Sequence, residues 1–291
     1  MIVVGDEILG GYVTDTNSPW LAERLRAHGV PFTRIHVVPD TSAAIDEALQ
    51  AELARSRPRL IVTSGGIGST PDDLTYEAVA ASLDRELVED PVIGERVAGA
   101  LDWSREQGLD VSEAFAWHLG RMARIPAGSH LLLREGGWAA GVAVDVDGGC
   151  DAGGVTIVIL PGVPSEFRAL MEHAVEPAVL EGRNVVPTVT ETEHALPEST
   201  LNLAFVELME RWPGVKLGSY PGRPMLIRLS GEPAAVAEAT DFVRGAVDEL
   251  SDTPAGRRLT EAWDGRGSRA TDDDPRASAT NETATHDEEH A

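Results

Sequence analysis

Short apolar runs and helix-spaced apolar positions alternate along residues 1–83. A short apolar run bounded by turn residues predicts a buried strand, whereas apolar residues three or four apart predict a helix. The predicted strands are Ile2–Val4, Thr33–Val38 and Leu60–Thr63, and the predicted helices are Pro19–His28, Ser42–Arg55 and Thr75–Leu83. Strands that alternate with helices predict an α/β domain with a mainly parallel sheet and helices on both faces.

The pattern continues with a longer helical region and two more strands. Residues 92–124 have helical spacing, and their predicted core positions are Val92, Val97, Leu101, Phe115, Leu119 and Met122. The predicted strands are Gly141–Val146 and Val155–Leu160. After the second strand comes a turn, Pro161–Pro164, and then a helix that starts near Ser165 or Glu166 and runs to about His173. We therefore predict that the first domain covers residues 1–175.

A smaller α+β unit is predicted for residues 185–252. Its predicted strands are Val185–His194, Lys216–Tyr220 and Met225–Ser230, and its predicted helices are Thr200–Trp212 and Pro233–Leu250. From Thr253 onward the chain is rich in Gly, Ser, Thr, Asp and Glu and poor in apolar residues. Such a composition cannot bury enough apolar surface to fold, so residues 253–291 are predicted to form a disordered acidic tail.

The charge balance is strongly acidic. The formal net charge is −24, and Lys216 is the only lysine. Binding to nucleic acids or to anionic membranes needs a basic surface, so both classes are excluded as general partners. The apolar runs are far shorter than a membrane span, and the first residues lack the features of a secretory signal. Cys150 is the single cysteine, which rules out an intramolecular disulfide and favours a cytoplasmic location.

The same charge leads to a prediction about salt. Repulsion among excess carboxylates destabilises the compact state, and dissolved ions screen that repulsion. We therefore expect the unfolding midpoint to be higher in molar KCl than in a buffer of low ionic strength, as in a protein adapted to a very salty cytoplasm. Thermal unfolding followed by circular dichroism at both salt concentrations measures this, and equal midpoints would exclude halophilic adaptation.

The strongest candidate for a binding site follows the strand Leu60–Thr63. The chain there contains Gly65, Gly66 and Gly68, and it then reaches Asp72 and Asp73 at a predicted helix start. Glycines allow a backbone to approach a ligand closely with exposed N–H groups, and a helix N-terminus adds positive potential. The loop therefore predicts a site for a phosphate or pyrophosphate, with Thr70 and Thr75 in the same segment. One of the two acids could be a helix cap, but two exceed what a cap needs.

Two carboxylates beside a phosphate repel it unless a cation lies between them. A divalent metal such as Mg²⁺ bound by Asp72 and Asp73, or a catalytic role for Asp73, would account for them. Gly5, Asp6 and Glu7 follow the first strand, so they belong to the same edge of a parallel sheet, where ligands bind. Gly162, in the turn after Val155–Leu160, has an N–H that could also reach the ligand.

Four motifs in order give the chain a family resemblance. They are Gly5-Asp6-Glu7-Ile8-Leu9-x-Gly11, Asp15-Thr16-Asn17, Gly65-Gly66-Ile67-Gly68-Ser69-Thr70-x-Asp72-Asp73-x-Thr75 and Leu160-Pro161-Gly162-Val163-Pro164-Ser165-Glu166. Together they resemble CinA-type proteins, whose N-terminal domain belongs to the MoaB/Mog molybdopterin-binding superfamily. The smaller unit, with Pro197-Glu198-Ser199, resembles the second subdomain of CinA-type proteins.

The resemblance implies a three-layer fold and a phosphate chemistry. In the Mog branch the domain binds molybdopterin and adenylates it, and in the CinA branch it resembles a metal-dependent pyrophosphatase for ADP-ribose-like nucleotides, with FAD as another candidate substrate. The catalytic acid of the Mog glycine loop corresponds to Asp73, and Asp6 is a second candidate. The ligand would be a small pterin or nucleotide. The superfamily also implies self-association as a dimer or trimer.

The chain departs from the family in two places. Residues Gly136–Gly141 stand where the family shows a Gly-Thr-Ala-Pro-Gly loop, and Trp138 lies within them. Full-length CinA proteins often carry a C-terminal deamidase domain, whereas only a polar tail follows residue 255 here. Deamidation of nicotinamide mononucleotide is therefore not expected. Three functions remain open at this point: adenylation of molybdopterin, cleavage of a nucleotide pyrophosphate, and ligand binding without turnover, as in a sensor.

Overall fold

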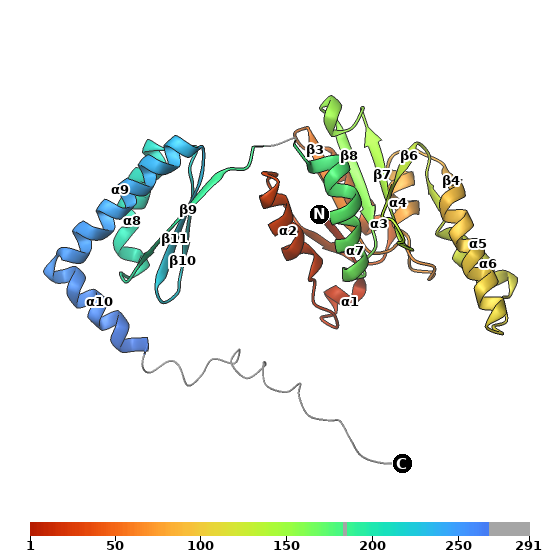
Figure 1. Ribbon diagram of the computed structural model, residues 1–291, viewed down its shortest axis with the longest axis horizontal. Helices are drawn as coiled ribbons and strands as arrows, with labels where there is room; N and C mark the ends of the chain where they lie inside the picture. The colour runs from red at the N-terminus through yellow and green to blue at the C-terminus, as the bar shows by residue number, and fades with distance from the viewer. Residues whose placement is uncertain (183–184, 268–291) are drawn as a thin grey trace, which may run out of the picture. The chain divides into compact units, whose positions relative to one another are not determined.

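A computed structural model describes residues 1–182 and 185–267, and these separate into two compact units, Met1–Val186 and a second unit from Pro187 onward. The first unit is built on a six-stranded sheet in the order β2-β1-β3-β8-β7-β6 (Figure 1). The strands are β1 (Ile2–Val4), β2 (His36–Val38), β3 (Arg59–Ser64), β6 (Ser129–Leu133), β7 (Ala140–Val146) and β8 (Val155–Leu160). The strands β2, β1, β3 and β8 run parallel, β7 pairs antiparallel with β8, and the edge strand β6 pairs antiparallel with β7.

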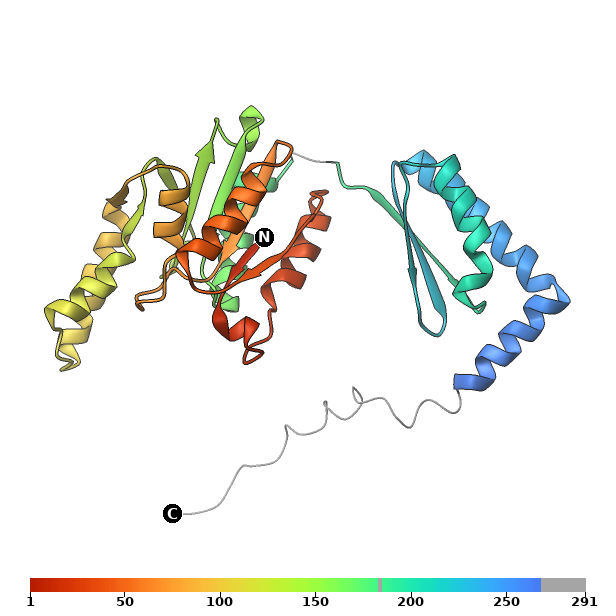
Figure 2. The same cartoon turned by 180° about the vertical axis from the view of Figure 1, so that it is seen from behind.

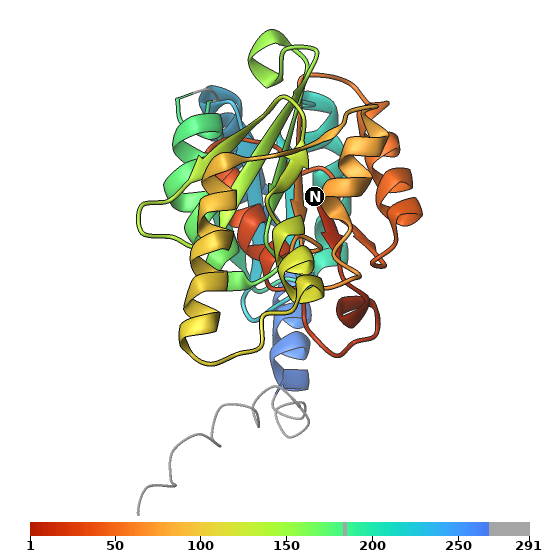
Figure 3. The ribbon, with the colours of Figure 1, turned by 90° about the vertical axis from the view of Figure 1, so that its right-hand side faces the viewer.

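Alternation along the strands divides the core between the two faces of the sheet. Ile2 and Val4 belong to one apolar cluster, whereas Val3 belongs to the other, because successive side chains of a strand point to opposite faces. Helices α3 (Ser42–Leu53), α4 (Thr75–Ser82) and α5 (Pro91–Glu106) pack in the first cluster, and α2 (Asn17–Ala27) and α7 (Pro164–Leu170) pack in the second. Figures 2 and 3 show α3 and α4 on one side of the sheet and α7 on the other. The predicted three-layer α/β fold is confirmed.

One predicted strand of the first unit has different bounds, and three observed strands were not predicted. The strand expected over Thr33–Val38 forms only over His36–Val38, because its neighbour β1 has three residues to pair with it. The antiparallel edge strand β6 was not predicted, and neither was the small ladder of β4 (Leu87–Glu89) with β5 (Arg124–Pro126).

The helical region 92–124 consists of α5 and of α6 (Glu113–Arg121), which extend from one side of the unit (Figure 1). Val97 is buried as expected, but Val92 and Phe115 are 40% and 43% exposed, so their assignment to the core was wrong. Val92 follows the N-cap Asp90 by two residues, and α5 buries the stripe of Ile93 and Val97 instead. Four-residue spacing places those two side chains on one face, adjacent to the face that carries Val92.

The helix after β8 is longer than predicted. Beyond α7 it continues as a π-helix, η2 (Met171–Leu180), with Pro177 inside it. Proline has no N–H, and its ring collides with the carbonyl four residues earlier, so the wider π turn accommodates a residue that an α-helix would exclude. Met171 and Val175 are fully buried in this segment, which extends the apolar face well past His173.

Two buried glutamates of the first unit are paired with basic side chains. Glu176 in η2 accepts hydrogen bonds from Arg24 at 2.7 and 2.5 Å and lies 3.0 Å from the His28 ring. Glu52 in α3 accepts one from Arg59 at 2.8 Å. Burying a carboxylate is costly unless it is paired and hydrogen-bonded, so these pairs account for the two acids as links between elements.

The second unit is a three-stranded antiparallel sheet, β10-β11-β9, with helices on one face. Its elements are β9 (Thr188–His194), a 3₁₀ turn η3 (Glu198–Leu201), α8 (Asn202–Arg211), β10 (Lys216–Tyr220), β11 (Met225–Gly231) and α9 (Pro233–Asp252). Its core is formed by α8, α9 and alternate residues of β11 such as Ile227 and Leu229. The predicted α+β character of this region agrees with that arrangement.

The predicted tail is partly helical. Residues Pro254–Gly267 form α10, contrary to the expected disorder from Thr253 onward. The Thr253 hydroxyl accepts a hydrogen bond from Gly256 N at 2.9 Å, and Pro254 follows it, which is the usual chemistry of a helix start. The remaining part of the predicted tail, residues 268–291, lies outside the described residues. Within the described residues, no helix is both long and apolar enough to span a membrane.

A buried histidine makes the second unit sensitive to acid. His194 is 5% exposed, and burial lowers its pKa below 6.5, although a backbone hydrogen bond with Leu196 and the nearby Glu198 oppose the shift. The unfolded chain therefore takes up the proton first, so the stability of this unit should fall as the pH drops below about 6.5. Urea unfolding at pH 7 and pH 5 measures the loss, which His194→Gln should reduce. An equal loss in that variant would assign the pH dependence to other groups.

Candidate functional site

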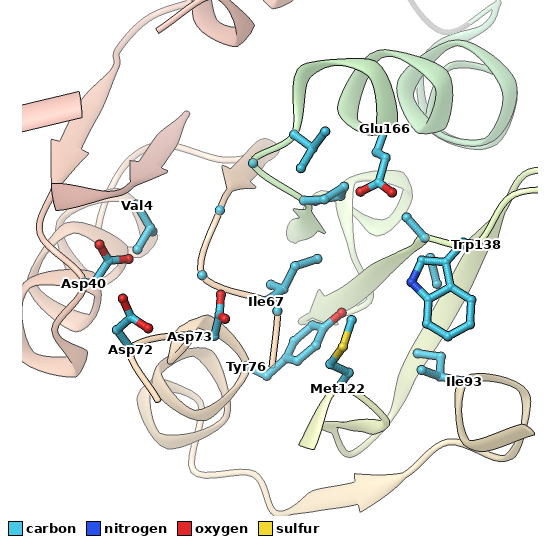
Figure 4. A pocket seen from close by; sticks show the side chains of 18 of the residues that line it. Val4, Asp40, Ile67, Asp72, Asp73, Tyr76, Ile93, Met122, Trp138 and Glu166 are labelled. Carbon is cyan, nitrogen blue, oxygen red and sulfur yellow. The ribbon is translucent and has the colours of Figure 1, made fainter. Parts of the chain in front are cut away.

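The loops that follow three parallel strands meet at one edge of the first sheet. Gly5 follows β1, Gly65 follows β3 and Pro161 follows β8. Val4, the glycine loop Gly65–Gly68 and the turn Pro161–Val163 line a cavity of about 390 Å³ at this edge (Figure 4). Parallel strands direct their carboxyl ends to the same edge, which explains why segments far apart in the sequence come together here.

The glycine loop needs its glycines for two different reasons. Gly65 and Gly66 have φ values of +103° and +67°, a region that residues with a Cβ rarely adopt. A Cβ on Gly65 would collide with the Val4 carbonyl oxygen, and one on Gly66 would collide with Thr75 Oγ1. The loop is therefore pressed against β1 and against the start of α4, and its path depends on the absence of side chains.

Unused backbone donors follow the first bend of this loop. Gly65 N donates to Leu160 O at 3.1 Å, which joins the loop to the end of β8. The N–H groups of Gly66, Ile67 and Gly68 donate to no other residue in the described part of the chain. Backbone donors that lack a partner need water or a ligand. Three of them in succession beside a cavity form a concave donor surface suited to an anion.

Asp73 closes the far end of the loop. Its Oδ2 accepts hydrogen bonds from Thr70 N at 2.8 Å and from Thr70 Oγ1 at 2.6 Å. Arg121 of α6 donates to Asp73 O at 2.7 Å and to Glu77 at 2.8 Å, and its side chain is only 10% exposed. These contacts hold the segment before α4 from both sides, so the Asp73 carboxylate has a fixed position at the cavity.

Further acids surround the same end of the cavity. Asp40, from the loop after β2, lines the cavity with Glu7, Asp72 and Asp73. Burial and the negative charges of Glu7, Asp6 and Asp72 raise the pKa of Asp40, although a hydrogen bond from Asp6 N at 2.7 Å opposes the shift. This end of the cavity therefore repels bare anions, even though its backbone donors attract them.

These acids do not form a preformed metal centre. No group of three or more His, Cys, Asp or Glu side chains within residues 1–182 and 185–267 is arranged to hold a metal ion. Asp72 and Asp73 line the cavity together with Asp40 and Glu7, but these acids are not placed to form such a group. We therefore assign no reaction step to a resident metal.

Asn17, at the start of α2, joins the two loops that frame the cavity. Its amide nitrogen donates to Ser64 Oγ at 3.0 Å and to Gly162 O at 2.9 Å, and the residue is 5% exposed. Gly162 also packs directly on Gly65, since a Cβ at Gly162 would lie 3.2 Å from Gly65 Cα. Asn17 therefore fixes the distance between the glycine loop and the turn after β8.

The opposite end of the cavity is apolar and aromatic. It is formed by Ile93, Tyr76, Met122 and Trp138, and Figure 4 shows them on the side away from Asp40 and Asp72. Arg96 is the basic residue among those that line the cavity in the described part of the chain. Its guanidinium donates to Trp138 O at 2.8 Å.

The predicted site residues fall into two groups. Gly65, Gly66, Gly68, Asp72, Asp73 and Gly162 line the cavity. The other predicted residues, Gly5, Asp6, Thr70 and Thr75, do not line it. Thr75 lies fully buried beneath the loop, where Oγ1 donates to Gly65 O at 2.8 Å, and Thr70 holds Asp73. Asp6 lies in the first turn of a short helix, α1 (Asp6–Leu9), and reaches the site through its hydrogen bond to Asp40.

Sequence reasoning missed several cavity residues. Asp40 follows a strand, so its position was a usable signal, but it does not belong to any of the four motifs. Tyr76 and Arg96 lie on helices and carry no local pattern that separates them from core or surface residues. Only the packing of α4 and α5 against the sheet brings them to the cavity.

Comparison with known proteins places the chain in a family. Residues 1–181 match the family described as "Probable molybdopterin binding domain". The chain is 34% identical to a protein from Pyrobaculum calidifontis over 224 residues, which are 76% of this chain and 79% of that protein. It is 33% identical to a CinA-like protein from Myxococcus xanthus, with 85% of this chain and 57% of that protein covered. A CinA-like protein from Mycolicibacterium vanbaalenii is 38% identical, with coverages of 69% and 47%.

The chain thus spans about half the length of these two CinA-like relatives. Among solved structures, the CinA protein with unknown function from Thermoplasma acidophilum is 30% identical, with a TM-score of 0.49 and coverage of 62% of this chain and 95% of that one. The family match confirms the resemblance expected from the four sequence motifs. The chain therefore belongs to the molybdopterin-binding domain family, with CinA-like proteins among its relatives.

Proposed function

We propose that the cavity binds the phosphate or pyrophosphate group of a small pterin or nucleotide. The observation that carries the proposal is the run of N–H groups at Gly66, Ile67 and Gly68, which lack partners in the described chain and line the cavity beside Asp73. Membership of a molybdopterin-binding family supports a pterin ligand. The nucleotide alternative rests on the earlier resemblance to CinA-type pyrophosphatases.

Isothermal titration calorimetry in molar KCl tests the proposal directly. The ligands are inorganic pyrophosphate, ADP, ADP-ribose, FAD and molybdopterin, each titrated with MgCl₂ and again with EDTA. We expect saturable binding of at least one ligand to one site. No binding by any of them under either condition would overturn the proposal.

The same titrations decide whether a divalent cation takes part. Asp72 and Asp73 would offer two carboxylates, and the remaining oxygen ligands would come from the phosphate itself and from water, as hard cations prefer. In that case MgCl₂ strengthens binding and EDTA abolishes it. Equal affinity under both conditions would assign anion binding to the backbone donors and Arg96 alone.

Asp73 is the proposed catalytic residue if the bound ligand is converted. Two reactions fit a phosphate chemistry at this position, and they have different products. Cleavage of a nucleotide pyrophosphate releases AMP from ADP-ribose or FAD, whereas adenylation transfers AMP from ATP to molybdopterin. Chromatography of the nucleotides after incubation distinguishes the two reactions.

A ligand-binding module without turnover is the second candidate function. The observation that favours it is the altered loop Gly136–Gly141, which lacks the Thr and Pro that the resemblance led us to expect and places Trp138 at the cavity. Saturable binding without product in either assay would select this function.

Self-association is a separate proposal, and light scattering in molar KCl would show whether the chain forms a dimer or trimer.

A further inference from the structure

A second cavity lies at the opposite edge of the first sheet. Its volume is about 670 Å³, and it is lined by residues from α2, from the segment before β2, from the start of β3 and from the end of η2. β1 pairs with β3 only at Thr63 and Ser64, whereas β3 begins at Arg59. The first residues of β3 therefore have β8 on one side and this second cavity on the other, at the end of the strand away from the glycine loop.

Most of the wall of the second cavity is apolar. Leu21 and Leu25 of α2 line it although they are buried, and Leu180 closes it from the end of η2. Phe32, in the segment before β2, adds a partly buried aromatic ring. A ligand with an apolar body would leave water here and pack against these side chains, as in most cavities that bind small molecules.

Cations outnumber acids around the polar part of the second cavity. The buried carboxylate of Glu52 accepts hydrogen bonds from Arg59 at 2.8 Å and from Arg55 at 3.2 Å. Arg34 lies 3.8 Å from the same carboxylate, so three guanidinium groups share one acid. Asp151 is the other acid that lines the cavity among the described residues. An excess of positive charge is unexpected in a chain with 48 acids and 24 lysines and arginines, and it favours an anion as a partner.

Arg34 has hydrogen-bond donors to spare. Its side chain is 44% exposed and lines the second cavity, and its guanidinium makes no hydrogen bond with the described residues. Its backbone N–H also has no partner in the described part of the chain, although its carbonyl oxygen accepts a hydrogen bond from Met1 N at 2.9 Å. Donors of this kind need water or a ligand, and the planar guanidinium matches the two oxygens of a carboxylate.

We propose that the second cavity binds a small organic anion, a monocarboxylate with an apolar body. The carboxylate pairs with Arg34 and Arg59, and the apolar body lies against the leucines of α2 and η2. A single charge fits better than a phosphate dianion, because the two acids of the second cavity would repel a further negative charge. This site is separate from the glycine loop and does not depend on the function proposed for that loop.

Three matched probes test the two halves of the proposed ligand. Octanoate has a carboxylate and an apolar chain, acetate has only the carboxylate, and 1-octanol has only the chain. Calorimetry in molar KCl should show saturable binding of octanoate to one site per chain, about tenfold or more tighter than either of the other probes, because a partly buried ion pair is screened less than an exposed one. No saturable binding of octanoate, or equal binding of all three probes, would overturn the proposal.

Variants of Arg34 assign the binding to the second cavity. Arg34→Gln removes the cation and should weaken octanoate by about tenfold or more, whereas Arg34→Lys keeps the charge and should retain part of the affinity. Arg26→Gln is the matched control, because Arg26 is exposed on α2 and does not line the second cavity. An Arg34→Gln protein that binds octanoate like the wild type would show that the anion site is wrong. Equal unfolding midpoints by circular dichroism exclude misfolding as the cause of a loss.

A competition titration separates the two cavities of the first unit. Octanoate should bind with the same affinity in the presence of pyrophosphate, and Arg34→Gln should leave the affinity for pyrophosphate unchanged. Displacement of octanoate by pyrophosphate would place both in the cavity beside the glycine loop and would contradict the second site. If pyrophosphate does not bind at all, the function proposed for the glycine loop fails, while the octanoate measurements still decide the second site.

Discussion

Replacing Gly66 by alanine is expected to weaken binding of the phosphate ligand strongly and to destabilise the first unit. Gly66 has a φ of +67°, and a Cβ there would collide with Thr75 Oγ1, which donates to Gly65 O at 2.8 Å. The variant must therefore accept backbone strain and also lose a buried hydrogen bond, at a combined cost of roughly 2–4 kcal/mol. Because the three free N–H groups start at this residue, moving the loop by about 1 Å should weaken binding on the order of a hundredfold.

Gly108 offers a matched control for the backbone strain. It also has a positive φ, +80°, but a Cβ there would contact nothing within 4 Å. Gly108→Ala should therefore cost only about 1 kcal/mol and leave ligand affinity unchanged. Urea unfolding and pyrophosphate titration of both variants measure the two effects. A Gly66→Ala protein that binds like the wild type would show that the glycine loop is not the anion site.

The order of elements around the parallel part of the sheet was predictable because it depends on local signals. The runs Leu60–Thr63 and Val155–Leu160 belong to central strands that have neighbours on both faces of the sheet. A continuous apolar run of this kind can be recognised directly in the sequence. The edge strand β6 was missed because its burial is irregular, with His130 and Leu133 exposed. The register of β6 against β7 is set by long-range pairing, which a local pattern does not contain.

The candidate site was predictable only in part, and for a related reason. Residues that act through the backbone, such as Gly65, Gly66 and Gly162, are visible in sequence because glycine is required there by conformation and close packing. Thr75 follows the glycine loop in the sequence just as a ligand-contacting residue would, yet its hydroxyl donates to Gly65 O and holds the loop instead. Tyr76, the next residue, is a cavity residue because of the direction in which α4 presents it.

The two ends of the cavity explain how an acidic protein could still bind a phosphate. Asp40, Asp72 and Asp73 oppose an anion, and burial together with the neighbouring acids raises the pKa of Asp40. Backbone donors carry no compensating full charge, so affinity for a bare phosphate should be low. If the ligand is the proposed pterin or nucleotide, apolar contacts at the other end would add affinity that does not depend on charge, and the glycine loop would orient its phosphate beside Asp73.

Asp73→Asn is expected to remove turnover while keeping the fold and the phosphate site. An asparagine Oδ1 can accept the two hydrogen bonds from Thr70 N and Thr70 Oγ1 that Asp73 now accepts, so the loop should keep its shape. The variant loses one negative charge beside the ligand, so in EDTA, where no cation bridges the two, pyrophosphate should bind at least as tightly as before. If the protein cleaves or transfers a phosphate, kcat should fall by about 10²- to 10⁴-fold, the usual contribution of a positioned acid or base.

Asp72→Asn separates this role from a general effect of charge. Asp72 also lines the cavity, but it does not accept the two Thr70 hydrogen bonds that close the loop on Asp73. We expect Asp72→Asn to change kcat far less than Asp73→Asn. Equal losses in the two variants would indicate a shared cation or a charge effect, and full activity of Asp73→Asn would overturn the assignment. Each of these conclusions requires that Asp73→Asn unfold at the same midpoint as the wild type. The same carboxylate serves the proposed reaction and the shape of the loop, so a loss of activity could otherwise come from a distorted loop.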